Sequence, residues 1–457
     1  MRSTFGGLQV AASGLAAQRR AIEAAGQNIA NVNTPGYSRQ RVDLAAMASH
    51  TAGIHTGSAT WGVGVQVTGQ SRIVDQFLIQ RVQAERSSQG FAEEIQTTYS
   101  RLELTFGEPG DSGLAAQLED FWNAWDTVVI APEDLAARSA LLQQAEGVAN
   151  RFADLSASMD AQVDDAIERA KVVVDDVNAT AKQIARLNTE ISAAAQLGTS
   201  ANELMDQRDE LVRQLSDKVG ISTRINDDGM MHINVGSVAL VQGANAHEMA
   251  LHVDGDPPTL ALHMSNTTLE VDPRTGSLAA LKTSVNDIIP KQQTQLDQVA
   301  AQLVSSVNGT HVTGNDLSGT SGRLFFDGAS ARDIRLHGDV VGQPGNVAAA
   351  LPTEGVFGGG NAALIGELAG GPADDAYRTL VAQLGVDAQT ASRVVDLQTK
   401  LTQQAQGQHD AVSGVSIDEE MTNLVAYQQA YSAAARFMTT IDEMLNTLIS
   451  GTGVVGR

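Results

Sequence analysis

The chain has 457 residues, a formal net charge of −23 and no cysteine. The lack of thiols excludes a disulfide framework and a thiolate metal site. So acidic a surface repels phosphate backbones and anionic lipid, and we therefore expect neither nucleic acid nor a membrane as a partner. Because no apolar run has the length of a signal-peptide core or of a membrane span, we expect neither classical secretion nor membrane insertion.

The first predicted element is an N-terminal helix with one apolar seam. Apolar or small residues recur in it at three- and four-residue spacing, which is coiled-coil periodicity. We expect this helix to end before Pro35, because proline disfavours the α region at the preceding residue. Pro35-Gly36 suits the middle of a type II turn, and Asn31 and Asn33 suit turn positions. The predicted seam comprises Phe5, Leu8, Ala12, Leu15, Ile22 and Ile29.

Three tryptophans are expected in or near the packed interior. An apolar helical stripe from Leu114 to Val128 includes Trp125, with Trp122 beside it. Core packing explains both of these residues better than a ligand cage does. Trp61 lies in a glycine-rich stretch, where either core packing or an intersubunit contact is compatible with the sequence, and we favour the core.

A rod of packed helices is predicted for the following section. Pro132-Glu133-Asp134 suits the first turn of a helix, with proline at a tolerated position and acids near the positive end of the dipole. The apolar register of this helix continues from Val148 to Ile191, which is far longer than an ordinary globular helix. Gly198-Thr199-Ser200 should break it, and a further helix is expected at about 202–219, ending at Gly220.

The apolar period then changes from helical to two, which predicts strands. Alternating residues at 221–225 and 231–235 flank Asn226-Asp227-Asp228-Gly229, the pattern of a hairpin. Further alternating pieces at 249–253, 260–264 and 269–271 predict that the meander continues. A helix-rich chain with one compact β section suggests a rod that carries a small outward module.

Helices are expected again after this β section. A helix starts at about Ser277 and should kink or split at Pro290. The segment 313–371 is rich in glycine and aspartate and is predicted to be a loop-rich excursion with a few short strands. Helices follow at about 374–406 and 416–449, and residues 451–457 are expected to form a loose tail.

The C-terminal helix repeats the coiled-coil periodicity of the N-terminal one. Its 32 positions from 417 to 448 would span roughly 48 Å. A helix with one narrow seam is marginal alone in water, so we expect the two terminal helices to pair with each other and with neighbouring copies. The predicted seam comprises Ile417, Met421, Leu424, Tyr427, Tyr431, Ala434, Met438, Ile441, Leu445 and Leu448.

The predicted fold class is mainly α with a β-rich module: terminal coiled-coil helices, an elongated helical-bundle rod, and a small outer section rich in β-structure and loops. We expect residues 1–40 and 415–450 to form a discontinuous terminal domain. The rod takes residues 41–219, 276–312 and 372–414. The β-meander module takes 220–275, the excursion 313–371 and the tail 451–457.

Both ends of the chain carry motifs of a known family. Ser13-Gly14-Leu15, the string from Asn28 to Gln40, and Ser416-Ile417-Asp418-Glu419-Glu420-Met421 leading to Tyr427–Tyr431 resemble the terminal motifs of the bacterial flagellar axial proteins. This family contains rod, hook and hook-associated subunits. In the middle, the stretch from Asp206 to Leu211 and scattered matches between Leu118 and Arg138 resemble a hook-associated junction subunit more than a hook or rod subunit.

The resemblance implies a structural adaptor that joins hook to filament. It implies export of an unfolded chain through the flagellar type III apparatus, hence a cytoplasmic stage before secretion. The implied partners are copies of the same chain in a ring, hook subunits below, a second junction protein and the filament above, and a cytoplasmic export chaperone on the C-terminal helix. The implied assembly interface comprises Phe5, Leu8, Leu15, Ile22, Asn28, Ile29, Asn31, Pro35, Gly36, Tyr37, Ile417, Met421, Leu424, Tyr431, Met438, Ile441, Leu445 and Leu448.

Two alternatives stay open on the sequence. One is a hook or rod subunit. The other is an exported enzyme or adhesin that carries flagellar termini, which would need a pocket of convergent polar groups in the β section. His247-Glu248 misses the HExxH zinc pattern, and His252 follows in a segment that alternates like a strand. We therefore expect no catalytic residue, no metal ligand and no cofactor.

Overall fold

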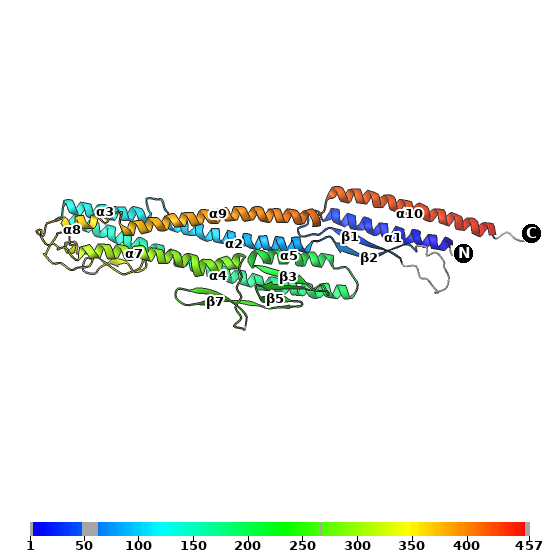
Figure 1. Cartoon of the computed structure of the whole chain (residues 1–457), viewed down its shortest axis with the longest axis horizontal. Helices are drawn as coiled ribbons and strands as arrows, with labels where there is room; N and C mark the ends of the chain where they lie inside the picture. Colours follow the sequence, from blue (N-terminus) through cyan, green and yellow to red (C-terminus); the bar gives the residue numbers. More distant parts are fainter. Residues whose placement is uncertain (1–2, 48–62, 266, 453–457) are drawn as a thin grey trace, which may run out of the picture.

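The computed structural model describes residues 3–47, 63–265 and 267–452. The expectations for Trp61 and for the tail beyond residue 452 lie outside this part of the chain, as does that for the side chain of Phe5. The molecule is a long rod of helices with a thinner projection at one end, where both termini lie (Figure 1). The predicted class, mainly helical with small antiparallel β-sheets, is confirmed.

The projection consists of two helices and a ribbon of two strands. Helix α1 (Ser3–Ala30) lies beside α10 (Ile417–Thr452), and the ribbon of β1 (Gln40–Ala46) and β2 (Val65–Arg72) packs against α1. The ribbon was not predicted, since we assigned residues 41–219 to a helical rod. Val42 and Leu44 in β1, and Val65 and Val67 in β2, alternate with polar residues, but each alternating piece is only a few residues long, so the strand signal is weak there.

The rod contains α2 (Gln76–Phe106), α3 (Leu114–Ile130), α4 (Leu135–Gln196), α5 (Asn202–Lys218) and α9 (Pro372–Ser413), together with the two helices that follow the β section. The stripe predicted on α3 is buried, and Trp125 is fully buried beside Trp122. Helix α4 begins three residues later than predicted, because Asp134 is its N-cap and accepts a hydrogen bond from the backbone N–H of Ala136 at 2.8 Å. Its 62 residues confirm the predicted long helix.

Pro290 splits the next helix, as predicted. Helix α6 (Ser277–Thr283) runs into one π-helical turn, Ser284–Ile288, before α7 (Ile289–His311). Proline lacks the N–H of a regular helical bond and clashes with the carbonyl four residues back, and the wider π turn removes that conflict.

The β section forms two sheets where we predicted one continuous meander. Strands β3 (Ile221–Ile225), β4 (Met231–Val235), β5 (Val238–Gln242) and β6 (Asn245–Ala246) form one sheet, and β7 (Met249–Asp254) and β8 (Thr259–Met264) form the other. The predicted β3–β4 hairpin is confirmed. The predicted strand at 269–271 is only an isolated bridge between His263 and Glu270.

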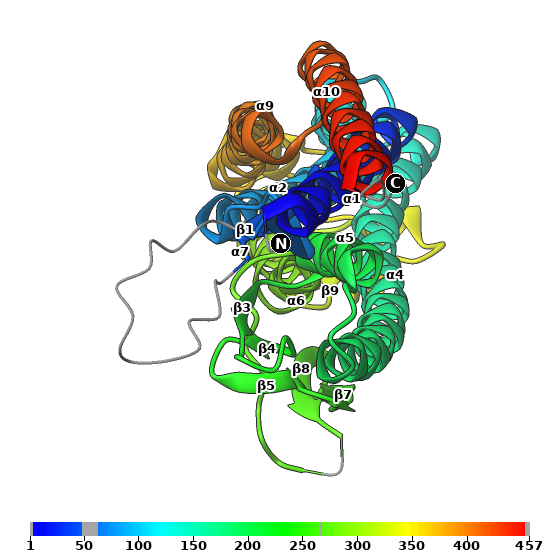
Figure 2. The same cartoon turned by 90° about the vertical axis from the view of Figure 1, so that its right-hand side faces the viewer.

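Both sheets lie along one side of the helical rod (Figure 2). Their buried residues Ile233, Leu240 and Leu262 belong to the same hydrophobic cluster as Val177 and Ile184 of α4. The β section therefore shares its core with the rod.

The segment 313–371 has little regular structure, as predicted: β9 (Phe326–Asp327), β10 (Arg335–Leu336), a 3₁₀ turn (Pro344–Asn346) and a short helix, α8 (Gly360–Gly366), that the sequence had not indicated. Phe325 and Phe326 are fully buried, with ring centroids 6.1 and 5.8 Å from that of Phe121 in α3. The segment is thus packed onto the end of the rod.

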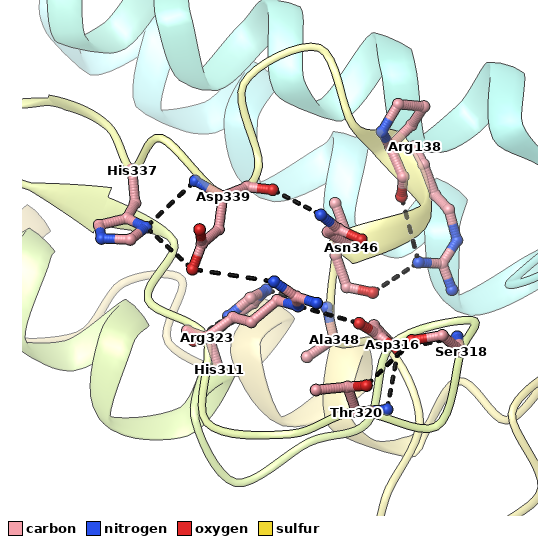
Figure 3. A network of polar contacts seen from close by, with 12 residues as sticks. Arg138, His311, Asp316, Ser318, Thr320, Arg323, His337, Asp339, Asn346 and Ala348 are labelled. Atoms are coloured by element: carbon pink, nitrogen blue, oxygen red, sulfur yellow. Dashed lines mark hydrogen bonds and ion pairs between the residues drawn. The ribbon is translucent and has the colours of Figure 1, made fainter.

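A buried polar network fastens this segment to α4 and α7 (Figure 3). Arg138 of α4 donates hydrogen bonds to the carbonyl oxygens of Pro132 and Val347 at 2.6 and 2.5 Å. His311 of α7 donates from Nδ1 to the carbonyl of Arg323 at 2.8 Å, and its Nε2 accepts from the N–H of Ala348 at 2.9 Å. Burial lowers the pKa of His311 to about 4, so it is neutral near pH 7.

Candidate assembly interface

The two terminal helices pack antiparallel and very closely at one end. A Cβ atom built on Gly7 would lie 2.9 Å from Cδ1 of Ile441, and one built on Gly14 would lie 3.9 Å from Cβ of Ala434. The apolar residues of α1 that are most buried are alanines, including Ala11, Ala21 and Ala25. Small residues allow two helix backbones to approach each other, so the seam depends on them.

The predicted seam residues of α1 are less buried than the alanines of this contact. Leu8, Leu15, Ile22 and Ile29 follow each other at intervals of seven residues, on one line along the helix, and each is half-buried. Ala12, which we had placed in the seam, is exposed, and Ala11 is buried in its place. The prediction was wrong there because it gave weight to large side chains, whereas the close contact selects small ones.

The predicted seam of α10 divides into an inner face and exposed flanks. Ile441 is buried against α1, and Leu424, Met438 and Leu445 are half-buried. Four other predicted residues are between 40 and 51% exposed, namely Ile417, Met421, Tyr431 and Leu448. Further large apolar side chains are exposed on the same helix, at Val425, Phe437, Met444 and Ile449. One partner helix therefore covers only part of the apolar surface of α10.

Asn28 is the centre of a buried hydrogen-bond network at the base of the projection. Its Nδ2 donates to the carbonyl of Gln40 at 2.9 Å and to Oε2 of Glu420 at 3.1 Å. Its Oδ1 accepts from the hydroxyl of Tyr37 at 2.9 Å and from the N–H of Gln40 at 3.0 Å. All the capacity of this amide is thus used. We call Asn28, Tyr37, Arg39, Gln40 and Glu420 the hub.

The hub joins the beginning and the end of the chain. Arg39 donates from Nε to Oε1 of Glu420 at 2.7 Å and from a terminal nitrogen to Oε2 of Glu419 at 2.8 Å. Because Glu420 is buried, the Arg39–Glu420 ion pair is shielded from solvent, and its hydrogen bond is charge-assisted. Burial and the nearby carboxylates of Asp206, Glu203 and Glu420 raise the pKa of Tyr37 to about 12. Tyr37 is therefore a neutral donor at every physiological pH.

A second set of polar contacts ties the hub region to α5 of the rod. The backbone N–H of Ser38 donates to Oδ2 of Asp206 at 3.2 Å. Arg72 of β2 donates to Asp206 at 2.8 Å and to Asp209 at 2.9 Å, with only 6% of its side chain exposed. Burial raises the pKa of Asp206, and the hydrogen bonds from Arg72 and Ser38 oppose that shift.

The remaining predicted residues form an exposed turn beside the hub. Asn31 donates to the carbonyl of Gln27 at 3.0 Å and accepts from Thr34, which is ordinary turn chemistry. Gly36 has a φ of 78°, and the N–H of Tyr37 bonds the carbonyl of Thr34 at 3.2 Å, as a type II turn across Pro35-Gly36 requires.

The residues that sequence reasoning missed were inside the motifs it had quoted. Ser38, Arg39, Gln40, Glu420 and Asp206 all occur in the matched strings, yet we did not assign them to a site. Considering the motif at 28–40 together with the one at 416–420 would have predicted the ion pair. Arg39 lies in one motif and Glu419 and Glu420 lie in the other, and the two chain ends were already expected to pair.

The described residues, 3–47, 63–265 and 267–452, contain no group of three or more His, Asp or Glu side chains arranged to hold a metal ion. Among the same residues, no helix combines the length and the apolar character that crossing a membrane would need.

Three family descriptions match the chain in order. Residues 8–37 match "Flagella basal body rod protein", residues 99–326 match "Flagellar hook-associated protein FlgK helical domain", and residues 406–451 match "Flagellar basal body rod FlgEFG protein C-terminal". The two terminal matches contain the α1/α10 pair and most of the hub, and the middle match covers much of the rod and the β section.

Three similar proteins carry one name. Flagellar hook-associated protein 1 of Bacillus subtilis is 29% identical over 509 aligned positions that cover both chains completely. Proteins of the same name from Escherichia coli and Salmonella typhimurium are 33% and 32% identical. Each of these two matches covers 69% of this chain, which spans 59% and 58% of their lengths.

A solved structure shares the fold. The flagellar hook junction protein FlgK from Burkholderia pseudomallei superposes with a TM-score of 0.50 at 22% identity, over 54% of this chain and 46% of that one.

Proposed function

Because this chain belongs to the FlgK family of flagellar hook-associated proteins, we propose that it assembles at the tip of the hook and joins the hook to the filament. The family is structural, so we assign no catalytic role to the chain. Assembly occurs within the flagellum, together with hook and filament components. The match to the FlgK helical domain over 99–326 favours a junction subunit over a hook or rod subunit.

The observation that carries the proposal is the incomplete burial of α10. Its inner face packs on α1, while Met421, Val425 and Phe437 are each close to half exposed. A helix that covers exposed apolar surface of this kind makes a stabilising contact. We infer that copies of this chain arrange their α1/α10 pairs side by side in a ring, with hook subunits below and a second junction protein and the filament above.

The same feature supports a folding step during assembly. A two-helix projection whose contact is made largely by glycines and alanines buries little apolar area, so it has little stability in isolation. We propose that both terminal helices are largely unfolded during export and fold when neighbouring copies cover their flanks. A cytoplasmic chaperone that masks the flanks of α10 before export is part of this proposal.

The test separates the inner face of α10 from its flanks. Leu424→Asp with Met438→Asp places charges against α1 and should unfold the pair, because an unpaired charge in a helix interface is expensive. Met421→Asp with Phe437→Asp should leave the pair able to form, yet abolish incorporation at hook tips and motility. Gln428→Asp with Ser432→Asp, at exposed polar positions of the same helix, is the matched control and should assemble normally.

Electron microscopy of hook tips and motility of complemented cells provide the readouts. A subunit confined to one short zone supports the junction role, whereas a long tube containing this chain would support a hook or rod subunit. Normal filaments on cells that carry the flank variant would show that α10 does not assemble through its exposed apolar residues.

A further inference from the structure

Two exposed stripes on the rod match each other in charge and spacing. On α9, Arg393, Leu397 and Lys400 follow at intervals of four and three residues, and all are exposed. On α4, Glu168, Val172 and Asp175 have the same intervals and are also exposed. At these intervals each triplet lies on one face of its helix, with an apolar residue between two charges. We name them the basic stripe and the acidic stripe.

Both apolar residues are exposed, and neither cation pairs with a carboxylate of the described residues. Leu397 is 58% exposed and Val172 is 62% exposed. Arg393 donates only to the hydroxyl of Thr390, at 3.2 Å, and neither it nor Lys400 forms an ion pair within the described part of the chain. Both cations are therefore available to carboxylates of another copy, and the net charge of the chain is −23.

The surroundings of each stripe extend the match. Val386, seven residues before Arg393, is 55% exposed and continues the basic stripe, and Ala161 stands in the equivalent place before Glu168. Asp164 adds a further exposed carboxylate to the acidic stripe. Lys171 pairs with Glu168 at 2.5 Å, an exposed contact that another cation can replace. Asp396 borders the basic stripe and leaves it less positive than the two cations alone.

The helices that carry the two stripes lie on either side of α2. Helix α2 lies between α9 and α4: Gln398 of α9 donates to Glu85 at 2.6 Å, and Arg169 of α4 bonds Glu94 (Figure 2). Helices α4 and α9 run in the same direction along the rod (Figure 1). A copy placed beside this one with its axis parallel can therefore present its acidic stripe to the basic stripe in parallel.

The heights of the two stripes along the rod differ by only a few residues. Gln398 of α9 is level with Glu85 of α2, and Arg169 of α4 is level with Glu94. Because Glu85 and Glu94 are nine residues apart, the position on α4 that is level with Gln398 is nine residues after Arg169, at about residue 178. Matching Leu397 with Val172 then requires a shift of about five residues, roughly 8 Å along the rod. Such a contact joins two different faces, so it repeats from copy to copy and closes into a ring or continues as a helix.

We propose that the basic stripe of one copy docks on the acidic stripe of the next, with Arg393 against Glu168, Leu397 against Val172 and Lys400 against Asp175. This inference rests on the proposed function, because it names the surface through which the rods of a junction ring contact each other. The apolar pair supplies the buried centre of the contact, and the two flanking ion pairs fix its register.

Disulfide cross-linking tests the contact directly, because the chain has no native cysteine. Val172→Cys on α4 and Leu397→Cys on α9 are separated by α2 within one molecule, so a disulfide between them must join two copies. Oxidation of hook tips that carry the double variant should give a ladder of dimers, trimers and higher species. Val172→Cys with Gln404→Cys shifts one partner by seven residues, roughly 10 Å, and should give little product.

Charge reversal is the second arm. Arg393→Glu with Lys400→Glu, added to the cysteine pair, should reduce the ladder several-fold, and further addition of Glu168→Lys with Asp175→Lys should restore it. Absence of a ladder from chains recovered at hook tips, or an equal ladder from the shifted pair, would overturn this inference and leave the proposed function intact. Failure of the cysteine-free chain to reach hook tips would instead overturn the proposed function.

Discussion

Replacing Asn28 by alanine should loosen the base of the terminal projection by about 3 kcal/mol. Asn28 is 1% exposed, and its amide serves four partner groups. Glu420 keeps Arg39 when the amide is removed, and the half-buried hydroxyl of Tyr37 can turn to water. The N–H and C=O of the buried Gln40 then lose the amide of Asn28 as their partner, which lowers the free energy of unfolding by about 1–3 kcal/mol for each group.

Amide hydrogen exchange of the chain bound to hook fragments, where we propose that the terminal helices are folded, measures this loss at the site. About 3 kcal/mol corresponds to exchange that is roughly a hundredfold faster at β1 and at the first turn of α10, where each 1.4 kcal/mol is tenfold. Asn33→Ala is the matched control, because Asn33 is exposed in the same loop, and we expect it to change stability by less than about 0.5 kcal/mol. Equal exchange in the two variants would refute the assignment of Asn28 as the central residue of the hub.

Two further predictions concern the rod. The pKa of His311 is about 4 in the folded chain and 6.5 in the unfolded one, so the unfolded state binds the proton first as pH falls. The free energy of unfolding therefore drops between pH 6.5 and pH 4, by up to roughly 3 kcal/mol. Urea unfolding at pH 7.5 and 4.5 should show this loss in the native chain and not in His311→Gln, and parallel losses in both would contradict the prediction. Replacement of residues 222–271 by a Gly-Ser linker should lower Tm markedly, because it exposes Val177, Ile184 and their neighbours on α4, while incorporation at hook tips persists. A linker that replaces only the β7–β8 turn, 255–258, should leave Tm nearly unchanged. An unchanged Tm for the larger replacement would show that the β section does not share the core of the rod.

Strongly periodic segments could be predicted from the sequence, because one local pattern determines them. The apolar register of α4 continues over more than ten turns, and the change to period two marks β3 and β4 without ambiguity. The β1–β2 ribbon could not be predicted in this way, since it is held by packing on α1 and by polar contacts such as that of Arg72 with Asp206. These contacts join residues more than a hundred positions apart.

The candidate site was predictable in its location and not in its chemistry. Coiled-coil spacing indicated that both chain ends would pair, but it did not distinguish the inner face of α10 from its exposed flanks. That distinction depends on where α1 lies, and the seam is set by small residues such as Gly7 and Ala11 that carry little hydrophobic signal. Asn28 suited a turn or a cap in the sequence, and only the fold brings it to Gln40 and Glu420.

Amide exchange of the native chain, as a verified monomer and after addition to hook fragments, tests most directly whether the terminal helices fold upon assembly. We predict fast exchange in the monomer at roughly the first 35 and last 40 residues, with protected amides in the rod helices between about 75 and 215. Hook fragments should slow exchange at both ends together, because each terminal helix covers part of the other. Slow exchange at both ends of the monomer, unchanged by hook fragments, would contradict folding upon assembly.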